Sequence, residues 1–215
     1  MNSVKMKRAA RPKKRAYHHG DLKDQLVAAT EAIIRERGVD GFTLREAARR
    51  AGVSAAAPAH HFKDAKGLLA EVALRSFKDF GDALAAADAR GGTDPRKRLS
   101  EQGDAYVRFA LANPARFQLM FARAKCDMDY PGLHETGQRA FLVLERAVRD
   151  AMGVSGTMTP DALGFLLAMW SIVHGFAHLA LVGEFAGAAA EHGGKRAVLE
   201  TFLPLMLKHL PAPRS

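Results

Sequence analysis

Apolar residues recur three and four positions apart along most of this 215-residue chain, and the strict alternation of a half-buried strand is not seen. The first stripe is Leu22, Leu26, Ala29, Ile33 and Ile34, which predicts a helix that Gly38 ends. Glycine and proline separate the later stripes. The pattern predicts an all-α fold with helices over residues 21–37, 43–51, 54–61, 64–89, 95–112, 114–125, 131–152, 160–185 and 194–210.

Start and stop signals of two short helices follow Gly38 closely. Thr43 and Glu46 form a capping box, in which each side chain is expected to bind a backbone N–H that the first turn leaves free. Gly52 stands where a left-handed C-cap is wanted, and Ser54 is the N-cap of the next predicted helix. A helix, a glycine turn and a second helix make a helix-turn-helix.

This stretch resembles the DNA-binding unit of the TetR/AcrR family of transcriptional regulators. The matching positions are Gly38, Thr43, Leu44, Ala47, Ala48, Ala51, Gly52, Val53, Ser54, His61, Phe62, Lys66, Leu68 and Leu69. Ala59 departs from the pattern, because the family usually has a tyrosine there that touches the DNA backbone. The resemblance implies a helix-turn-helix domain of three helices over residues 17–70, then a helical ligand-binding and dimerisation domain over residues 71–215.

The resemblance and the polar positions together give a candidate DNA interface. Lys66 resembles the family's phosphate-contacting lysine and lies in the first turn of a helix. Small side chains leave few groups to read base edges, and Pro58 removes one backbone hydrogen bond near the start of the recognition helix. We expect the contacts to come from Thr43, Arg45, Ser54, Ala55, His60, His61 and Lys66.

Most of the net charge of +9 lies at the beginning of the chain. Residues 1–20 contain seven Lys or Arg, among them Arg15, and no acid, while the remainder is close to balanced. Residues 1–16 are therefore predicted to form a disordered basic arm that contacts DNA phosphates or a minor groove. A solubilising tail is the alternative.

The predicted helix 160–185 carries no charge between Leu163 and Val182, a length that could cross a bilayer. We reject a membrane span, because two histidines would lie near its centre and a helix buried on two faces has the same composition. One face is expected to line the core and the other to meet a second subunit. The last helix, which Pro204 should kink, is expected to contribute Leu199, Phe202, Leu203, Met206 and Leu210 to that homodimer interface.

The sequence Trp170-Ser171-Ile172-Val173-His174-Gly175 resembles the signature of the WHG-type C-terminal domain in the same family. Its aromatic and imidazole groups are one turn apart, so they can face one cavity. The predicted pocket for a small effector consists of Trp170, His174, His178, Phe117, Phe121 and Phe141. The equally weighted alternative is that these residues pack in the hydrophobic core, with their polar groups hydrogen-bonded inside the protein. A zinc ion on His174 and His178 lacks a third ligand, and the adjacent His18 and His19 do not converge on one metal.

Enzyme classes find no support in the sequence. A phosphate-binding loop, a nucleophile elbow and paired carboxylates are missing, and Cys126 lies near acids that raise a thiol pKa. A single cysteine suits a reducing cytoplasm, where we expect the protein. The sequence thus predicts a homodimeric repressor that needs no cofactor, binds a double-stranded DNA operator and leaves it when an apolar or aromatic effector binds. The alternative is an architectural DNA-binding protein without an effector.

Overall fold

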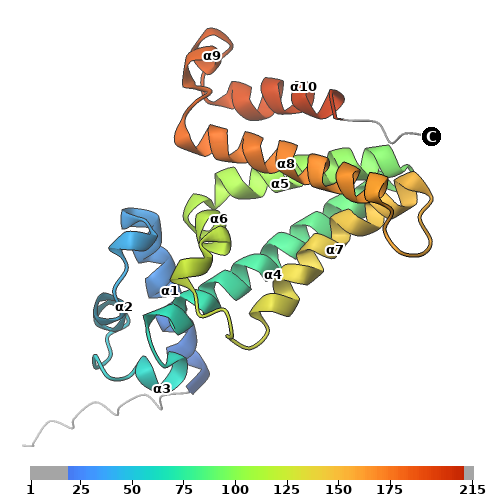
Figure 1. Ribbon diagram of the computed structural model, residues 1–215. Coiled ribbons are helices and arrows are strands. Elements are labelled where there is room, and N and C mark those ends of the chain that lie inside the picture. Colours follow the sequence, from blue (N-terminus) through green and yellow to red (C-terminus); the bar gives the residue numbers. More distant parts are fainter. Residues whose placement is uncertain (1–18, 211–215) are drawn as a thin grey trace, which may run out of the picture.

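A computed structural model describes residues 19–210 and the side chains from Leu22 onward, so the basic arm with Arg15 and His18 lies outside the described residues. The described chain is helical and has no strand. α1, α2 and α3 form one end of the molecule, α8, α9 and α10 lie at the opposite end, and α4 runs from the first group beside α7 (Figure 1). The bounds are α1 His19–Arg37, α2 Leu44–Arg50, α3 Ala59–Phe62, α4 Ala65–Gly91, α5 Pro95–Ala112, α6 Pro114–Phe121, α7 Leu133–Met152, α8 Pro160–Val182, α9 Ala186–Glu191 and α10 Leu203–Lys208.

The start of α2 confirms half of the predicted capping box. The Thr43 hydroxyl accepts a hydrogen bond from the Glu46 N–H at 3.2 Å. The Glu46 carboxylate does not complete the box as predicted, because it accepts hydrogen bonds from Arg49 at 2.7 Å and Arg50 at 2.9 Å. Two guanidinium groups are stronger donors to a carboxylate than one backbone N–H. They hold the pKa of Glu46 at about 2.

The glycine turn after α2 is confirmed. Gly52 has φ of 69° and its N–H bonds to the Arg49 carbonyl, while the Val53 N–H bonds to the Ala48 carbonyl at 3.0 Å. This pair of bonds is a Schellman motif, which satisfies the last carbonyls of α2. The turn fixes the direction in which the chain leaves α2.

The prediction of a helix over residues 54–61 is wrong about where the helix begins. α3 spans only Ala59–Phe62, and the preceding residues form turns, one of them closed by a 3.0 Å bond from the Ala57 N–H to the Ser54 carbonyl. An α-helix beginning at Ser54 would need the N–H of residue 58 to bond to that carbonyl. Pro58 has no N–H, and it is fully buried, so the α-helix begins only after it.

α4 begins at the predicted cap and joins the two halves of the molecule. The Asp64 carboxylate accepts a hydrogen bond from the Gly67 N–H at 3.0 Å. Only glycine fits at position 67, since an added Cβ would lie 2.0 Å from the Phe62 carbonyl oxygen. Near its start α4 packs Leu68 into the core with α1 and α2, and further on it packs Phe80 into the second core with α5 to α8. Displacement of α4 therefore affects both cores.

The later helices follow the predicted pattern with corrections at their ends. α5 matches its predicted range and begins after the predicted Asp94 cap. α6 ends at Phe121 and a 3-10 helix, Arg123–Lys125, follows it. The short α9 lies where a break was predicted, since its alanines favour a helix although Gly187 lies within it. The last helix is interrupted by a π-helical segment, Val198–Phe202, directly before α10 and its Pro204, as the predicted kink requires.

α8 buries one face and exposes the other. It is the one helix in residues 19–210 that is long and apolar enough to cross a membrane by length and composition, which by itself is weak support for a span. Leu163, Leu167, Leu179 and Val182 are exposed at 47%, 45%, 44% and 54%. They recur at helical spacing, so the protomer presents a long apolar stripe. The structure differs from the prediction for α10, because Leu203 is fully buried in the protomer's own core and Leu205 is exposed.

Candidate DNA interface and ligand cavity

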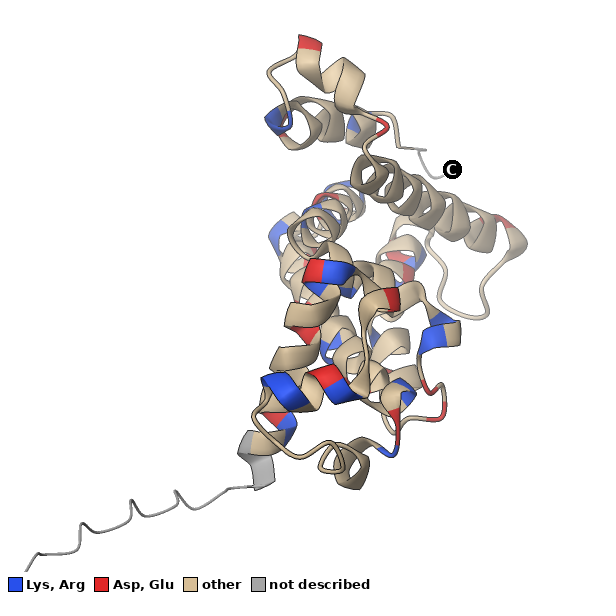
Figure 2. Ribbon diagram, turned by 90° about the vertical axis from the view of Figure 1, so that its left-hand side faces the viewer, with Lys and Arg blue, Asp and Glu red and all other residues tan. Residues whose placement is uncertain are grey.

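The predicted DNA-contacting residues lie around α2, α3 and the start of α4. Thr43, Arg45, Ser54, Ala55, His60 and Lys66 are exposed, and His61 is half-buried. Figure 2 shows Lys and Arg beside Asp and Glu over the lower part of the molecule, where α1 to α3 lie. Because the charges in this described domain are mixed, individual unpaired cations decide where phosphates can bind.

The arginines of α2 have different surroundings. Arg49 is paired with Glu46, and Arg50 is paired with both Glu46 and Glu36. Arg45 is exposed, and within residues 19–210 its guanidinium has no ion-pair partner. Arg49 and Arg50 therefore stabilise the helix-turn-helix through these ion pairs, whereas Arg45 is available to DNA.

Lys63 is a further candidate that the sequence reasoning missed. It is exposed directly after α3 and has φ of 65°, which is unusual for a residue other than glycine. Its ammonium group has no ion-pair partner in the described part of the chain. The adjoining Lys66 is also exposed, so two lysines border the α3 to α4 turn. The signal in the sequence was the pair of lysines on either side of the Asp64 cap.

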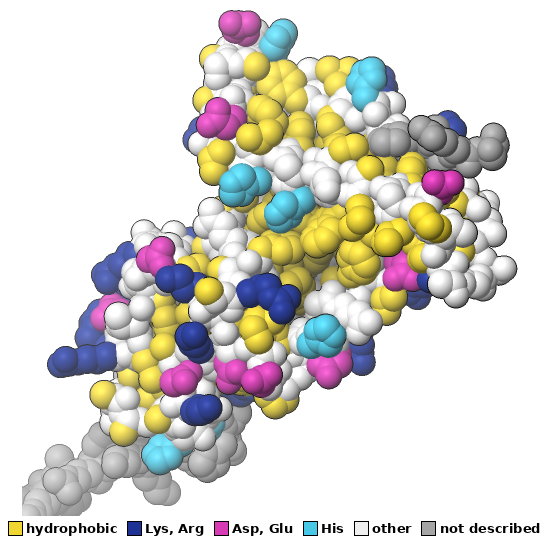
Figure 3. All heavy atoms as spheres, viewed as in Figure 1, with side chains coloured by type: hydrophobic (Ala, Val, Ile, Leu, Met, Phe, Trp, Pro, Cys, Tyr) yellow, Lys and Arg dark blue, Asp and Glu magenta, His cyan; other side chains and the backbone are white. Residues whose placement is uncertain are grey.

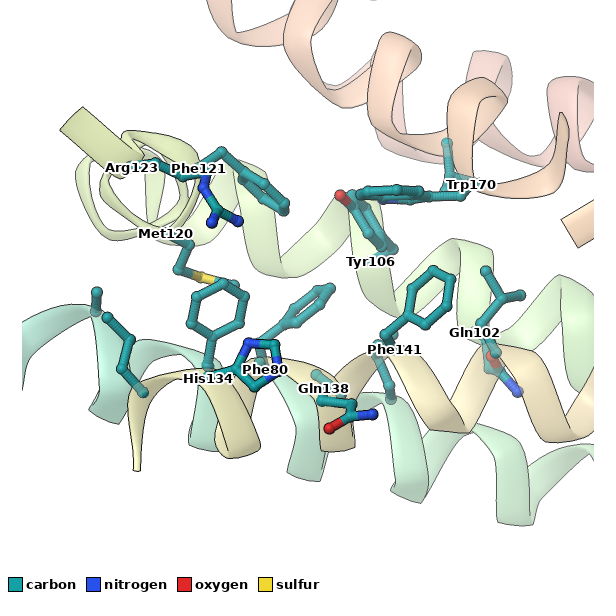
Figure 4. A pocket seen from close by; sticks show the side chains of 18 of the residues that line it. Phe80, Gln102, Tyr106, Met120, Phe121, Arg123, His134, Gln138, Phe141 and Trp170 are labelled. Atoms are coloured by element: carbon teal, nitrogen blue, oxygen red, sulfur yellow. The ribbon is translucent and has the colours of Figure 1, made fainter. Parts of the chain in front are cut away.

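A cavity of about 530 Å³ lies between α4, α5, α6, α7 and α8. Figure 3 shows an apolar hollow on this face, and Figure 4 shows aromatic side chains converging in it. Its lining is mostly apolar, as in small-molecule sites of about 300–1,000 Å³. The lining includes Phe77, Phe80, Leu84, Tyr106, Met120, Phe121, Phe141, Leu144, Met169 and Trp170, with Gln102, Arg123, Cys126, His134 and Gln138 as polar members.

Three of the six predicted pocket residues, Trp170, Phe121 and Phe141, line this cavity. Phe117 is buried behind its wall, where its ring lies 5.1 Å from that of Phe121. His178 is exposed and does not line the cavity, since it lies on the outer face of α8. In residues 19–210 no group of three or more His, Cys, Asp or Glu could hold a metal ion.

His174 supports the cavity from behind. Its Nδ1 and the Tyr106 hydroxyl are 2.7 Å apart and share a hydrogen bond. Aromatic rings surround the imidazole, and the nearest, Phe121, has its ring centroid 4.7 Å away. Burial, followed by the neighbouring His178, lowers the pKa of His174, and burial raises the pKa of Tyr106. Both groups therefore stay neutral at pH 7, and the hydrogen bond fixes the Tyr106 ring in the cavity wall.

Gln102 is the buried polar residue of the lining that sequence reasoning missed. It is 3% exposed, and its Nε2 donates to the Asp88 carboxylate at 2.6 Å. Its Oε1 has no hydrogen-bond partner in the described part of the protein. The amide orientation is defined, because the carboxylate can only accept and must face the nitrogen. One buried acceptor in the lining is thus left to a ligand or solvent molecule.

A segment of residues 122–132, here named the bridging segment, lines the cavity and also contacts the DNA-binding domain. Its Arg123, Cys126 and Met128 line the cavity. Burial raises the pKa of the Cys126 thiol to about 11, so this cysteine is a packing residue rather than a nucleophile. Between these lining positions, other residues of the segment point to the DNA-binding domain.

Three contacts join the bridging segment to that domain and to the first turns of α4. The Asp127 N–H donates to the Lys66 carbonyl at 3.2 Å. Lys125 pairs with Asp40, which lies in the 3-10 helix Val39–Gly41 after α1. The Tyr130 hydroxyl donates to the Glu71 carboxylate at 2.8 Å.

Glu71 extends this connection to α1. Its carboxylate is 2.9 Å from the ammonium of Lys23 and 2.9 Å from the guanidinium of Arg75, which also binds Asp24. Although burial alone raises the pKa of Glu71, the hydrogen bonds from Lys23, Arg75 and Tyr130 hold it below its usual value. A charged carboxylate thus links α1, α4 and the bridging segment.

Two family models match this chain. The model of bacterial regulatory proteins of the tetR family matches residues 26–72, and that of the tetracyclin repressor-like C-terminal domain matches residues 99–198. The C-terminal match includes Trp170 to Gly175, and the finer WHG assignment stays a prediction.

Curated relatives match parts of the chain. The HTH-type transcriptional regulator BetI 1 of Chromohalobacter salexigens is 37% identical over 75 residues, which are 35% of this chain and 37% of that protein. The regulator BetI of Yersinia pestis is 29% identical over 117 residues, which are 54% of this chain and 59% of that protein. The chain therefore spans less than two thirds of the length of these relatives.

Solved structures match nearly the whole chain. A protein of unknown function from Rhodococcus sp. RHA1 is 31% identical with a TM-score of 0.71, over 92% of this chain and 99% of that one. A regulatory protein of the tetR family from Rhodococcus RHA1 has the same fold at 17% identity, with a TM-score of 0.65 over 90% of this chain and 98% of that one. The two family-model matches, together with the helix-turn-helix and the helical C-terminal domain, show that the chain belongs to the TetR family of transcriptional regulators, which are DNA-binding proteins and not enzymes.

Proposed function

We propose that this regulator is a homodimeric repressor that leaves its DNA operator when a small molecule occupies the cavity. The observation that supports this best is the bridging segment, whose residues alternate between lining the cavity and bonding to the DNA-binding domain. A ligand that displaces Arg123 or Met128 acts on the same short stretch as Asp127, which holds the backbone of Lys66. Cavity occupancy and the position of the DNA-contacting lysine are thereby coupled.

The ligand would act by selecting between two arrangements of the DNA-binding domains. Two recognition helices of a dimer read successive major grooves when they lie about 34–36 Å apart. A ligand that binds better to an arrangement with another spacing lowers operator affinity by its differential affinity for the two. α4 carries the change, because it packs in both cores.

The homodimer is proposed from the exposed stripe of α8. Leu163, Leu167, Leu179 and Val182 lie on it, and Gly164 and Gly175 have open space where a Cβ would point. Small residues between apolar ones let a second helix approach closely. The exposed Leu205 of α10 adds to an apolar surface that a copy of the chain would cover.

The first test is to select bound fragments from genomic DNA with the purified protein and to footprint them at two salt concentrations. A repressor gives a short, near-palindromic footprint that Lys66→Ala weakens at both concentrations. Even coverage of all fragments that modest salt abolishes would support the architectural alternative, since that binding rests on charge alone.

A further inference from the structure

We propose that the cavity takes an elongated apolar acid, whose anionic group lies at the mouth by Arg123 and His134 and whose far end donates a hydrogen bond to Gln102. This deepens the proposed ligand response by naming the chemistry of the effector. It rests on how polar groups are distributed in a lining that is otherwise apolar.

The mouth of the cavity is cationic. Arg123 and His134 both line it and are exposed, and Figure 4 shows the Arg123 side chain directed into the space above His134 and Phe80. The Arg123 guanidinium has no ion-pair or hydrogen-bond partner among the residues that the structure describes. The described lining contains no Asp or Glu. An anion therefore gains an ion pair with Arg123 here, while a cation meets the like charge of this guanidinium.

The other end of the cavity accepts a hydrogen bond. Gln102 lies beyond Phe141 in Figure 4, on the opposite side of the view from Arg123. Among the described residues its Oε1 is a buried acceptor without a hydrogen-bond partner, and its amide nitrogen is held by Asp88, which also pairs with Arg98. A hydroxyl or amide N–H on the ligand would satisfy this oxygen, whereas a bare methyl end would leave it unpaired.

The middle of the cavity selects for an apolar body. Phe77, Phe80, Tyr106, Phe121 and Phe141 contribute aromatic surface between the two polar ends. Burial of such a body supplies most of the affinity, and the two polar groups set orientation and selectivity.

The test uses the full chain without DNA and the fluorescence of Trp170, which is the one tryptophan of the sequence and lines the cavity. Four probes that share a ten-carbon chain are titrated: decanoic acid, 10-hydroxydecanoic acid, 1-decanol and decylamine. We expect decanoate to bind about tenfold more tightly than decanol or decylamine, as for a charge-assisted hydrogen bond. The terminal hydroxyl should add about threefold more.

Two variants assign the effects. Arg123→Gln should remove the preference for acid over alcohol, whereas Arg139→Gln, an equal loss of charge at an exposed position of α7 outside the lining, should keep it. Gln102→Met should abolish the advantage of the hydroxy acid, and circular dichroism checks its fold. Equal binding of acid, alcohol and amine, or an unchanged preference in Arg123→Gln, would overturn the proposal.

The outcomes separate this proposal from the proposed function. Selective acid binding without any loss of operator affinity would leave the ligand chemistry standing and reject the ligand-responsive repressor. Operator release by decanol but not by decanoic acid would support the ligand-responsive repressor and reject the acidic effector.

Discussion

At the scale of single residues, three arginines on α2 differ in whether they form an ion pair with Glu46, and this difference decides which of them is available to DNA. Glu46 binds Arg49 and Arg50, and it also places its N–H on the Thr43 hydroxyl. Arg45 has none of these contacts. Identical side chains within two turns therefore divide between holding the helix-turn-helix together and remaining available to DNA.

We predict that Arg45→Ala lowers operator affinity about tenfold, as expected for the loss of one good contact to a base or phosphate. Arg49→Ala is the matched control on the same helix and should change affinity less than about twofold, because the Arg49 guanidinium is already bound to the Glu46 carboxylate through two N–H groups. Fluorescence anisotropy with a labelled operator measures both. Equal losses in the two variants would show that pairing with Glu46 does not keep Arg49 from DNA.

A second prediction concerns the pH dependence of stability. Since burial lowers the pKa of His174, the unfolded chain takes up a proton first as pH falls below about 6.5. The contribution of His174 is therefore complete above that pH and is lost as pH falls toward its lower folded pKa. In His174→Gln, which can still accept from Tyr106, the melting temperature should fall less between pH 7.5 and 5.5 than in the unmodified protein.

His60→Gln is the control for this measurement, because His60 is exposed on α3, away from α8 and the cavity. It should retain most of the pH dependence. Parallel melting curves for His174→Gln and the unmodified protein would mean that His174 is already solvated in the folded state.

At the scale of elements, local signals in the sequence predicted most helix bounds, and tertiary contacts decided the rest. Asp94 and Asp64 form caps with groups two to three residues away, so both were predictable. The start of the recognition helix was not, because Pro58 is buried and cannot supply the N–H that Ser54 needs. Gln102 and Arg123 join the cavity from separate helical segments, and no spacing in the sequence connects them.

The bridging segment gives a prediction at this scale. Tyr130→Phe removes the hydrogen bond to Glu71, which keeps its partners Lys23 and Arg75. Ligand binding measured by Trp170 fluorescence should stay within about twofold, while the ligand-induced loss of operator affinity shrinks about threefold or more. Asp129→Asn, in the same segment, should leave both quantities unchanged. If Tyr130→Phe behaves like this control, the coupling runs through α4 packing instead.

The exposed stripe of α8 gives another prediction. Leu167→Glu places a charge within the proposed dimer interface and should convert a dimer into a monomer, as measured by size-exclusion chromatography with light scattering. Arg139→Glu, an exposed substitution on α7, should remain dimeric. A monomeric unmodified protein at micromolar concentration would contradict the homodimer.

At the scale of the whole molecule, the DNA-contacting end and the cavity are parts of one helical framework. α4 contributes to both hydrophobic cores. The bridging segment adds polar contacts to the first half of α4. The family and the all-α fold could be predicted from the helix-turn-helix pattern. The connection between the sites could not, since it depends on residues such as Tyr130 and Glu71 that are distant in sequence.

Operator affinity with and without a cavity ligand tests this connection most directly. The footprinted operator is titrated with protein by fluorescence anisotropy at one salt concentration, in the absence and presence of a ligand that saturates the Trp170 signal. We predict that the ligand weakens operator binding by about 5- to 150-fold, the usual range of coupling between two sites. Full occupancy of the cavity with unchanged operator affinity would contradict a ligand-responsive repressor.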